Sequence, residues 1–331
     1  MDRSGPVAAL RRAVSDFAVG YDVDDELWCV ALSGGPDSLA LTAVAVDLRA
    51  TVALIVDHGL QPDSAAVAET ARGQALALGC ADARVLPVSV GSAGGPEAAA
   101  RDARYDALRW AAAGAPVLLA HTLDDQAETV LLGLGRGSGP RSMAGMRPHH
   151  PPWCRPLLGV RRAVTHAACA QLGLTPWHDP HNADPAYTRA RLRMRALPVL
   201  EEVLGGGVAE ALARTAAALR EDCDALDDLA LRELAATVAD DGLDTARTVA
   251  DDGLDTARLA QLPDALRRRV IRGWLLANGA TNLTDRQIRG VDTLVTRWRG
   301  QGGVAVGSPL RRERLIAARS NGKLRLRREP V

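Results

Sequence analysis

A glycine pair set between a buried strand and a helix constrains the fold of this chain more than any other feature. The stretch reads Ser33-Gly-Gly-Pro-Asp-Ser38. It follows the apolar run Leu27 to Leu32, which predicts a buried strand, and it precedes an apolar run that predicts the first turns of a helix. Glycines there bring the backbone close to a ligand, and the free N–H groups of a helix start attract an anion. We therefore expect an anion cradle, to which the two serines add hydroxyl donors.

The carboxylate of Asp37 lies inside this loop. A carboxylate beside a phosphate is repulsive unless a cation separates them, so the sequence implies Mg²⁺. The common phosphate loop needs a lysine after its glycines, whereas the chain has a single lysine, Lys323. That also argues against a Schiff-base enzyme. Taken alone, the hexapeptide is equally compatible with a glycine-rich turn that binds nothing.

Predicted strands and helices alternate over the first part of the chain. Further strands are predicted at Thr51–Val56, 80–88 and Pro116–Ala120, with helices over 5–19, 63–78 and 97–113. This alternation predicts an α/β fold, a Rossmann-like parallel sheet with helices on both faces. Asp57 and His58 follow one of the strands, at the edge where open sheets bind ligands.

The length of 331 residues and the run Gly205-Gly-Gly207 predict two domains. We expect a catalytic domain over 1–205 and a smaller domain over 206–331. The second domain is predicted to be mainly helical and to end in short β-strands, with helices over 208–236, 263–278 and 284–298.

Charges are segregated along the chain although the net charge is zero. The formal charge is +7 over 141–195, −9 over 221–258 and +11 over 261–331. Basic blocks on either side of an acidic one favour a protein that holds a polyanion at two places. Arginine-rich usage that reflects the base composition of the genome is the alternative.

The five cysteines are scattered and contain no Cys-x-x-Cys pair. This argues against a zinc ribbon, an iron–sulfur site and a disulfide framework. No apolar run is long enough to span a membrane and the start lacks a signal pattern. We therefore expect a cytoplasmic protein with no membrane partner.

A second motif follows the strand Pro116–Ala120. It reads His121-Thr-Leu-Asp-Asp-Gln-Ala-Glu-Thr129. The helix dipole favours acids in a first turn, which accounts for each acid singly but not for the whole nonapeptide beside an anion loop. Together with Ser-Gly-Gly-x-Asp-Ser, it resembles the tRNA(Ile)-lysidine synthetase family. These are N-type ATP pyrophosphatases with a pyrophosphate-binding loop.

Two further stretches resemble that family. Ala100 to Tyr105 is similar to its Ala-Arg-x-x-Arg-Tyr helix, and Asp179 to Arg193 to its Asp-x-x-Asn and Arg-Asn-Arg-x-Arg segment. The chain departs from the family at Ala190, where an asparagine is usual, and at Gln61, where an arginine is frequent. Both departures bear on how tRNA is held.

The resemblance implies an adenine nucleotide α-hydrolase-like fold and a ligase that forms a carbon–nitrogen bond. ATP with Mg²⁺ would adenylate the C2 oxygen of the wobble cytidine in tRNA(Ile) with anticodon CAU. Free L-lysine would then attack C2, so that pyrophosphate and AMP are released and the tRNA reads AUA in place of AUG. A homodimer is left open.

The residues that match the motifs fall into three groups. Candidate ATP-binding residues are Ser33, Gly34, Gly35, Pro36, Asp37, Ser38, Asp57 and His58, with Asp37 as the metal ligand. Candidate catalytic residues are Asp37, His121, Asp124 and Asp125. Candidates for binding lysine or tRNA are Arg101, Arg104, Asp125, Glu128, Arg189, Arg191 and Arg193.

Some roles stay open within these groups. An amine is a poor nucleophile while protonated, since the free pKa of a lysine ammonium is about 10.4. Asp125 and Glu128 are candidates for binding the ammonium, and His121 or Asp124 for taking its proton. Asp124 is also a candidate second metal ligand.

Two other functions compete with this interpretation. A tRNA thiolase shares the loop but needs catalytic cysteines or an iron–sulfur site, and no cysteine pair stands near the loop. A nucleotide-sensing RNA-binding protein without chemistry would not require so many acids near phosphates. The Gly- and Pro-rich stretch 134–160 is expected to be a long loop acting as a lid or an RNA contact. An eleven-residue segment is repeated without change over 237–258, which we interpret as a tandem insertion.

Overall fold

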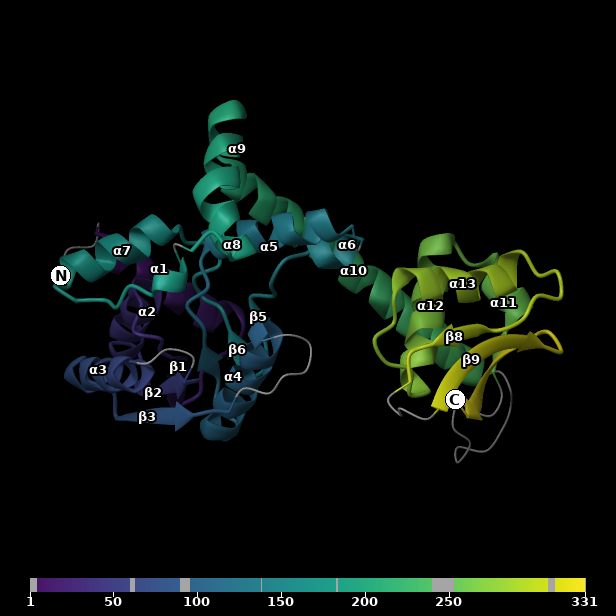
Figure 1. Cartoon of the computed structure of the whole chain (residues 1–331), viewed down its shortest axis with the longest axis horizontal. Coiled ribbons are helices and arrows are strands. Elements are labelled where there is room, and N and C mark those ends of the chain that lie inside the picture. The colour runs from purple at the N-terminus through teal and green to yellow at the C-terminus, as the bar shows by residue number, and fades with distance from the viewer. Residues whose placement is uncertain are drawn as a thin grey trace. The chain divides into compact units, whose positions relative to one another are not determined.

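The computed structural model describes residues 5–59, 63–89, 96–137, 139–182, 184–239, 253–308 and 313–330. The chain divides into two compact units, Met1–Ala217 and Ala218–Val331 (Figure 1). Residues 240–252, which are the end of the first copy of the repeated segment and the start of the second, lie outside the described residues.

The first unit is built on a six-stranded sheet. The strands are β1 Leu27–Ala31, β2 Ala50–Asp57, β3 Asp82–Pro87, β4 Val117–Leu118, β5 His149–His150 and β6 Trp153–Cys154. They lie in the order β3-β2-β1-β4-β6-β5, and all neighbours are parallel except the pair β5–β6. The direction of the strand order reverses between β1 and β4, which is the place where open parallel sheets bind ligands.

Helices cover both faces of this sheet. They are α1 Pro6–Gly20, α2 Pro36–Val46, α3 Ser64–Ala77, α4 Pro96–Ala112 and α7 Arg162–Gln171. Alternate residues of β1 point to opposite faces: Trp28 and Val30 pack in one core with α1, α2, α3 and α7, whereas Cys29 packs in another with α4. The predicted parallel α/β sheet is thus confirmed, with both faces buried as such sheets require.

The stretch predicted as one long loop is partly structured, so the prediction of a 134–160 loop is wrong. Helix α5, Leu123–Arg136, extends into it, followed by the short helix α6, Pro140–Met143, and by β5 and β6. Trp153 and Cys154 are buried in β6, which pairs with β4. A strand of two residues is too short to show a periodic pattern. The prolines Pro151-Pro152, directly before β6, favoured the prediction of a loop.

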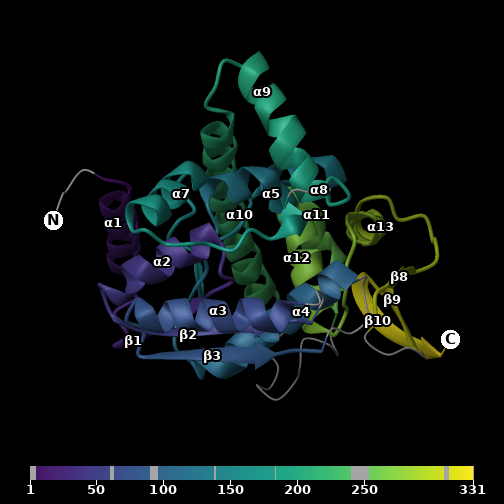
Figure 2. The same cartoon turned by 60° about the vertical axis from the view of Figure 1, so that its left-hand side comes forward.

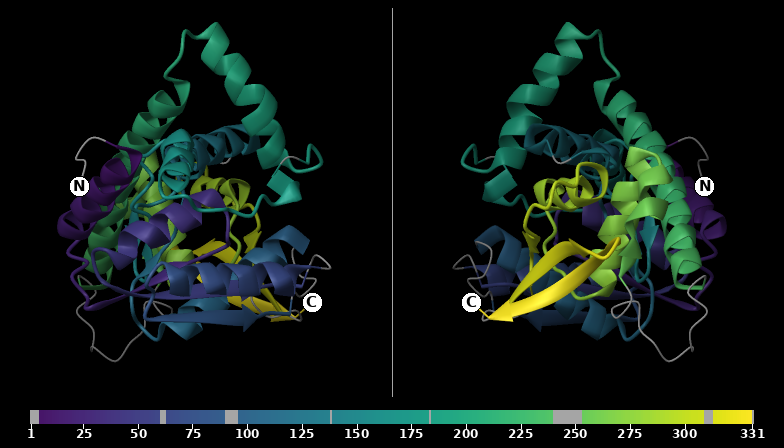
Figure 3. Two further views of the ribbon diagram at one scale, coloured as in Figure 1. Left: turned by 90° about the vertical axis from the view of Figure 1, so that its left-hand side faces the viewer. Right: turned by 90° about the vertical axis from the view of Figure 1, so that its right-hand side faces the viewer.

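A helical hairpin closes the first unit. It comprises α8 Thr188–Arg191, the π-helical turn η2 Leu192–Ala196, α9 Leu197–Val203 and the start of α10. Helix α10 spans Val208–Ala239, and its residues from Ala218 onward belong to the second unit. Figures 2 and 3 show α9 and the start of α10 as two arms joined at one end. Glu201 holds the turn by accepting from the backbone N–H groups of Val208 (3.0 Å) and Ala209 (3.1 Å). Ala209 also packs against Leu123 and Ala127 of α5, so the start of α10 belongs to the core of the first unit.

The second unit contains the second part of α10, which contributes Ala230 and Leu234 to its core, and three further helices on an antiparallel sheet. The helices are α11 Thr256–Gln261, α12 Asp264–Ala277 and α13 Asp285–Thr296; the strands are β7 Leu254–Asp255, β8 Val304–Val306, β9 Glu313–Ser320 and β10 Lys323–Pro330. The sheet order is β7-β10-β9-β8. Trp274, Ile271 and Leu324 are fully buried in its core. Helices followed by short strands confirm the prediction for this part of the chain.

Within the described part of the chain, no helix is both long and apolar enough to cross a bilayer.

Candidate active site

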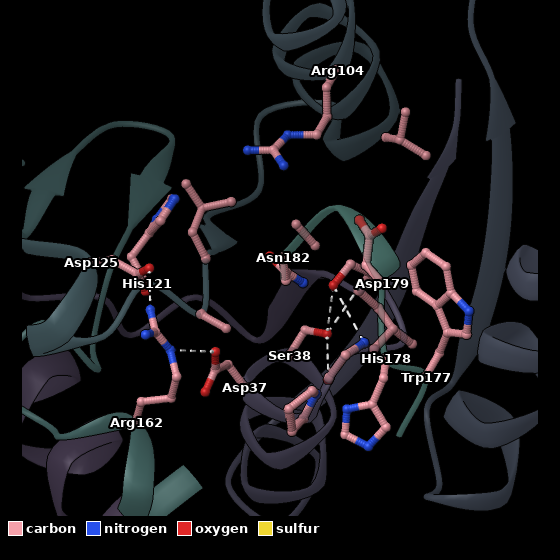
Figure 4. A pocket seen from close by; sticks show the side chains of 18 of the residues that line it. Asp37, Ser38, Arg104, His121, Asp125, Arg162, Trp177, His178, Asp179 and Asn182 are labelled. Carbon is pink, nitrogen blue, oxygen red and sulfur yellow. Dashed lines mark hydrogen bonds and ion pairs between the residues drawn. The ribbon is translucent and has the colours of Figure 1, made fainter. Parts of the chain in front are cut away.

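A pocket of about 600 Å³ lies at the carboxyl edge of β1, β2 and β4 (Figure 4). Ten of the residues predicted from the sequence line it: Ser33, Gly35, Pro36, Asp37, Ser38, His58, Arg104, His121, Asp125 and, from η2, Arg193. The other predicted residues do not line it: Gly34, Asp57, Arg101, Asp124, Glu128, Arg189 and Arg191.

The loop after β1 is shaped as an anion cradle. Ser38 Oγ donates to the Gly35 carbonyl (3.0 Å) and accepts from the Ser33 backbone N–H (3.2 Å). Gly34 has φ 79°, a conformation that favours glycine, and its carbonyl accepts from the Trp177 N–H (2.9 Å). No side chain caps the start of α2, so its first N–H groups remain available to an anion.

Asp37 projects from this helix start into the pocket. Its Oδ2 lies 3.7 Å from Arg162 Nε, its Oδ1 lies 4.0 Å from His166 Nε2, and the Thr165 hydroxyl donates to Oδ1. Burial raises the pKa of Asp37 and nearby Asp125 adds to that, although Thr165, Arg162 and His166 act to lower it. The ionised carboxylate is therefore under-compensated and suited to receive a cation.

The start of α5 is held by a capping box. The Thr122 hydroxyl accepts from the Asp125 N–H (3.4 Å), and Asp125 Oδ2 accepts from the Thr122 N–H (2.8 Å). Asp125 Oδ1 accepts from Arg162 Nη2 at 2.6 Å. Burial would raise the pKa of Asp125, but Arg162 and the Thr122 hydrogen bonds outweigh it and lower the pKa. Both oxygens of this carboxylate thus have partners, although the group still lines the pocket.

The other two acids of α5, Asp124 and Glu128, pair with arginines. Asp124 accepts from the Arg162 backbone N–H (2.7 Å) and lies 3.3 Å from Arg161 Nη2. The Glu128 side chain is fully buried and accepts from Arg193 through both oxygens, at 2.8 and 3.2 Å. Arg162 (3.4 Å) and Arg189 (3.8 Å) complete its surroundings.

Arg162 is the main site residue that the sequence analysis missed. Its guanidinium lies between Asp37 and Asp125, as the dashed lines of Figure 4 show. A signal was available: acids crowded around a phosphate loop require an internal cation, and with no lysine nearby the arginine pair Arg161-Arg162 could supply it. Trp177, His178 and Asn182 also line the pocket, and they lie within or next to the stretch that carried the family resemblance.

Three buried nitrogens in the pocket wall have no hydrogen-bond partner among the described residues: His58 Nδ1, Arg104 Nε and His121 Nδ1. Buried polar atoms are rarely left unpaired, so these point to a bound ligand. Burial lowers the pKa of Arg104. Burial also lowers the pKa of His121 to about 3, against the effect of Asp125 and with help from nearby arginines, so this imidazole is neutral.

The remaining predicted arginines lie outside the pocket. Arg101 Nη2 donates to the Tyr105 hydroxyl (3.2 Å), and both Arg101 and Arg104 stack on the Tyr105 ring, at 4.7 and 5.3 Å. Arg191 is turned to its own segment, where it donates to the Pro185 carbonyl (2.9 Å). Of the two departures from the family pattern, Ala190 is buried and Gln61 lies outside the described residues.

Comparison with known proteins agrees with this geometry. A PP-loop domain matches residues 9–200, and a TilS substrate binding domain matches residues 254–324. The tRNA(Ile)-lysidine synthase of Mycobacterium tuberculosis is 69% identical over 334 residues, covering 100% of both chains. The chain belongs to the tRNA(Ile)-lysidine synthase family. The enzymes of that name from Mycobacterium leprae (66%, 100% of both chains) and Rhodococcus erythropolis (58%, 96% of this chain and 94% of the other) are similar to it as well.

A solved structure shares the fold. The U34-tRNA thiolase NcsA from Methanococcus maripaludis, with its [4Fe-4S] cluster, has a TM-score of 0.55 at 17% identity, covering 65% of this chain and 80% of the other. At that identity the likeness concerns the fold alone. The family, the fold and an ATP-binding enzyme, all predicted from the sequence, are thereby confirmed for this member of the tRNA(Ile)-lysidine synthase family.

Proposed function

We propose that this chain is a tRNA(Ile)-lysidine synthase. It joins free L-lysine to C2 of the wobble cytidine in tRNA(Ile) with anticodon CAU, and it converts ATP to AMP and pyrophosphate. The observation that carries the proposal is the pocket itself, in which a PP-loop faces Asp125 of α5, Arg162 of α7 and Arg193 of η2, in a chain whose curated relatives bear that name. We expect it to act in the cytoplasm, and a homodimer remains a prediction from the sequence.

The PP-loop would hold the β- and γ-phosphates of ATP. Backbone N–H groups at the start of α2 and the hydroxyls of Ser33 and Ser38 are the donors for those oxygens. Leu54, Val56 and Leu119 give the pocket an apolar wall suited to a purine. Donors placed around the departing pyrophosphate stabilise the charge that develops on it.

Asp37 is the residue that would hold Mg²⁺. Mg²⁺ binds through one or two carboxylates together with substrate phosphates and waters, and the single pocket-facing carboxylate of the PP-loop fits that demand. Among the described residues no group of three potential ligands could hold a metal unaided. When bound there, Mg²⁺ would neutralise charge on the phosphates.

The first half-reaction is adenylation of the tRNA. The C2 oxygen of the wobble cytidine attacks the α-phosphate of ATP, and pyrophosphate leaves. Arg104 and Arg193 line the pocket and are the cations suited to guide phosphate oxygens. Glu128 fixes Arg193 by a two-oxygen contact and so acts through it.

In the second half-reaction the amine of lysine attacks C2 and AMP leaves. Asp125 lines the pocket, whereas Glu128 is buried behind its arginines, so Asp125 is the better group for the ammonium. Of the two candidate bases, Asp124 is occupied by Arg161 and Arg162. His121 lines the pocket, and its buried Nδ1 has no partner among the described residues, so we assign the proton transfer to it on position. Its pKa of about 3 has to rise when the substrates bind before it can take a proton from an ammonium.

Replacing Asp125 with Asn is expected to separate the two half-reactions. Asparagine keeps the shape but loses a charged contact of about 1.5–3 kcal/mol, so the KM for lysine should rise roughly ten- to a hundredfold. Pyrophosphate release with tRNA and ATP should persist. Asp124→Asn is the matched control, because Asp124 does not line the pocket and the lysine KM should stay unchanged. An unchanged lysine KM in Asp125→Asn would move the ammonium site elsewhere.

The second unit is proposed to bind tRNA, because it carries the TilS substrate binding domain and the basic block 261–331. A chain ending at Ala217 keeps the helix turn and Ala209 that complete the first unit. It should bind ATP normally and lose most tRNA affinity, and the loss should be the salt-dependent part. Filter binding across a salt series measures this. If the shortened chain keeps its tRNA affinity with the same dependence on salt concentration, the arginines of 261–331 only face solvent.

Release of pyrophosphate that depends on added tRNA(Ile) tests the proposal against a nucleotide sensor without chemistry. A tRNA-dependent burst is the expected result. ATP binding without any release would favour the sensor.

A further inference from the structure

The guanidinium of Arg162 contacts acids from two different helices beside the pocket. Arg162 opens α7 and is largely buried, with 16% of its side chain exposed. Its Nη2 lies 2.6 Å from Asp125 and 3.4 Å from Glu128, and its Nε lies 3.7 Å from Asp37. Its backbone N–H is held separately by Asp124. A single cation therefore compensates acids from two different helices, α2 and α5.

The contacts of Arg162 with the three acids differ in length and in the burial of the acid. Those to Asp125 and Glu128 lie on the side of α5, where the acids are more buried, with 15% and 0% of their side chains exposed. The contact to Asp37 is the longest of the three, and Asp37 is the most exposed of these acids at 24%. Asp37 is thus the partner that Arg162 can give up most easily while staying anchored to α5.

We propose that Arg162 is an internal counter-ion that takes the place of a divalent cation beside Asp37 until a nucleotide brings one. This rests on the proposed function in one respect, that Asp37 is the ligand of Mg²⁺. Arg162 is a positioning residue in this scheme. It keeps Asp37 and Asp125 from binding a metal by themselves, so that metal enters only with ATP.

The arrangement of the acids supports this. Without the guanidinium, Asp37 would retain the Thr165 hydroxyl and His166 at 4.0 Å, and Asp125 would retain Thr122 and Arg193 at 3.6 Å. The two carboxylates would then lack the cation that contacts both of them. Two carboxylates that share no cation from the protein are suited to bind a hard cation such as Mg²⁺. Among the described residues no group of three or more potential ligands could hold a metal ion.

The test uses the full-length protein without tRNA or lysine and measures its Tm with and without millimolar MgCl₂. NaCl of equal ionic strength is the reference. Arg162→Gln should melt lower than the unmodified protein in NaCl and regain about 2–4 °C in MgCl₂. Its apparent Mg²⁺ affinity in the absence of ATP should be at least about tenfold tighter than that of the unmodified protein. The unmodified protein should respond to MgCl₂ only when ATP is added.

Three further variants make the result decisive. Arg161→Gln is the matched control: the neighbouring arginine pairs with Asp124, Glu201 and Glu210 but not with Asp37, so no Mg²⁺ response should appear. Arg162→Lys keeps a positive charge and should respond less than Arg162→Gln. Adding Asp37→Asn to Arg162→Gln should abolish the response.

Two results would overturn the inference: a Tm of Arg162→Gln that is indifferent to MgCl₂, or a response of the same size in Arg161→Gln. If Arg162→Gln is unfolded in NaCl, failure of MgCl₂ to restore a melting transition counts against it equally. Lysidine formation by the unmodified protein is assayed separately. Its absence would reject the proposed function, while the Mg²⁺ response would still decide the role of Arg162.

Discussion

Replacing Asp37 with Asn should abolish tRNA-dependent pyrophosphate release while making the nucleotide-free protein more stable. The loss of turnover should be at least about a hundredfold, since the phosphates lose the only carboxylate of the PP-loop that faces them. The gain in stability follows from the raised pKa of Asp37. An acid whose pKa is higher in the folded chain binds protons more readily when folded, so its ionised form destabilises the fold at neutral pH.

Asparagine keeps the shape and removes that charge. The Tm of Asp37→Asn should therefore exceed that of the unmodified protein at pH 7, and the difference should shrink as the pH falls toward the pKa of Asp37 and protonation relieves the unmodified protein. Calorimetry across pH measures this, with a pyrophosphate assay alongside. Undiminished turnover would remove Asp37 from the site, and a lower Tm at pH 7 would show that its contacts with Thr165 and Arg162 dominate.

Replacing Glu128 with Ala should be the most destabilising single change at the site. The carboxylate is fully buried and shared by Arg162, Arg189 and Arg193. Removing one partner of a buried charge cluster leaves uncompensated charge and costs about 3–5 kcal/mol. Urea unfolding measures the change in the free energy of unfolding, and a folded remnant should also have lost activity because Arg193 is no longer fixed.

Asp106→Ala is the matched control for this change. Asp106 pairs with Arg109 at 3.7 Å on the surface of α4, where both side chains are mostly exposed. Exposed pairs contribute less than about 1 kcal/mol, so this variant should unfold almost as the unmodified protein does. Equal losses in the two variants would mean that the cluster around Glu128 contributes no more than a surface pair.

Much of the fold could be predicted from the sequence because its signals are local. The apolar strands β1 and β2, the glycine turn at Gly34 and the amphipathic α12 and α13 each show in a short window. Strand β6 could not be predicted, since its two residues derive their structure from pairing with β4. The start of α10 likewise looked like the far side of a linker, whereas Ala209 packs on α5.

In the pocket, too, some residues could be predicted from local sequence signals and others depend on the folded structure. The loop residues and His121 were predicted because motif position and strand ends place them at the ligand edge. The division of labour among the acids of α5 was not predictable, because it depends on which carboxylate meets which arginine. Arg162 lies 125 residues beyond Asp37 in the chain, and only folding brings the two together.

Label transfer from lysine tests the central claim most directly. The full-length protein is incubated with tRNA(Ile) of anticodon CAU, ATP, Mg²⁺ and labelled L-lysine, and the tRNA is then digested to nucleosides. We predict that the label appears in a modified cytidine, in amounts that match the pyrophosphate and AMP released, and that tRNA(Met) with the same anticodon triplet stays unlabelled. Absence of the label from the nucleosides, with label incorporated instead from a sulfur donor, would contradict the account.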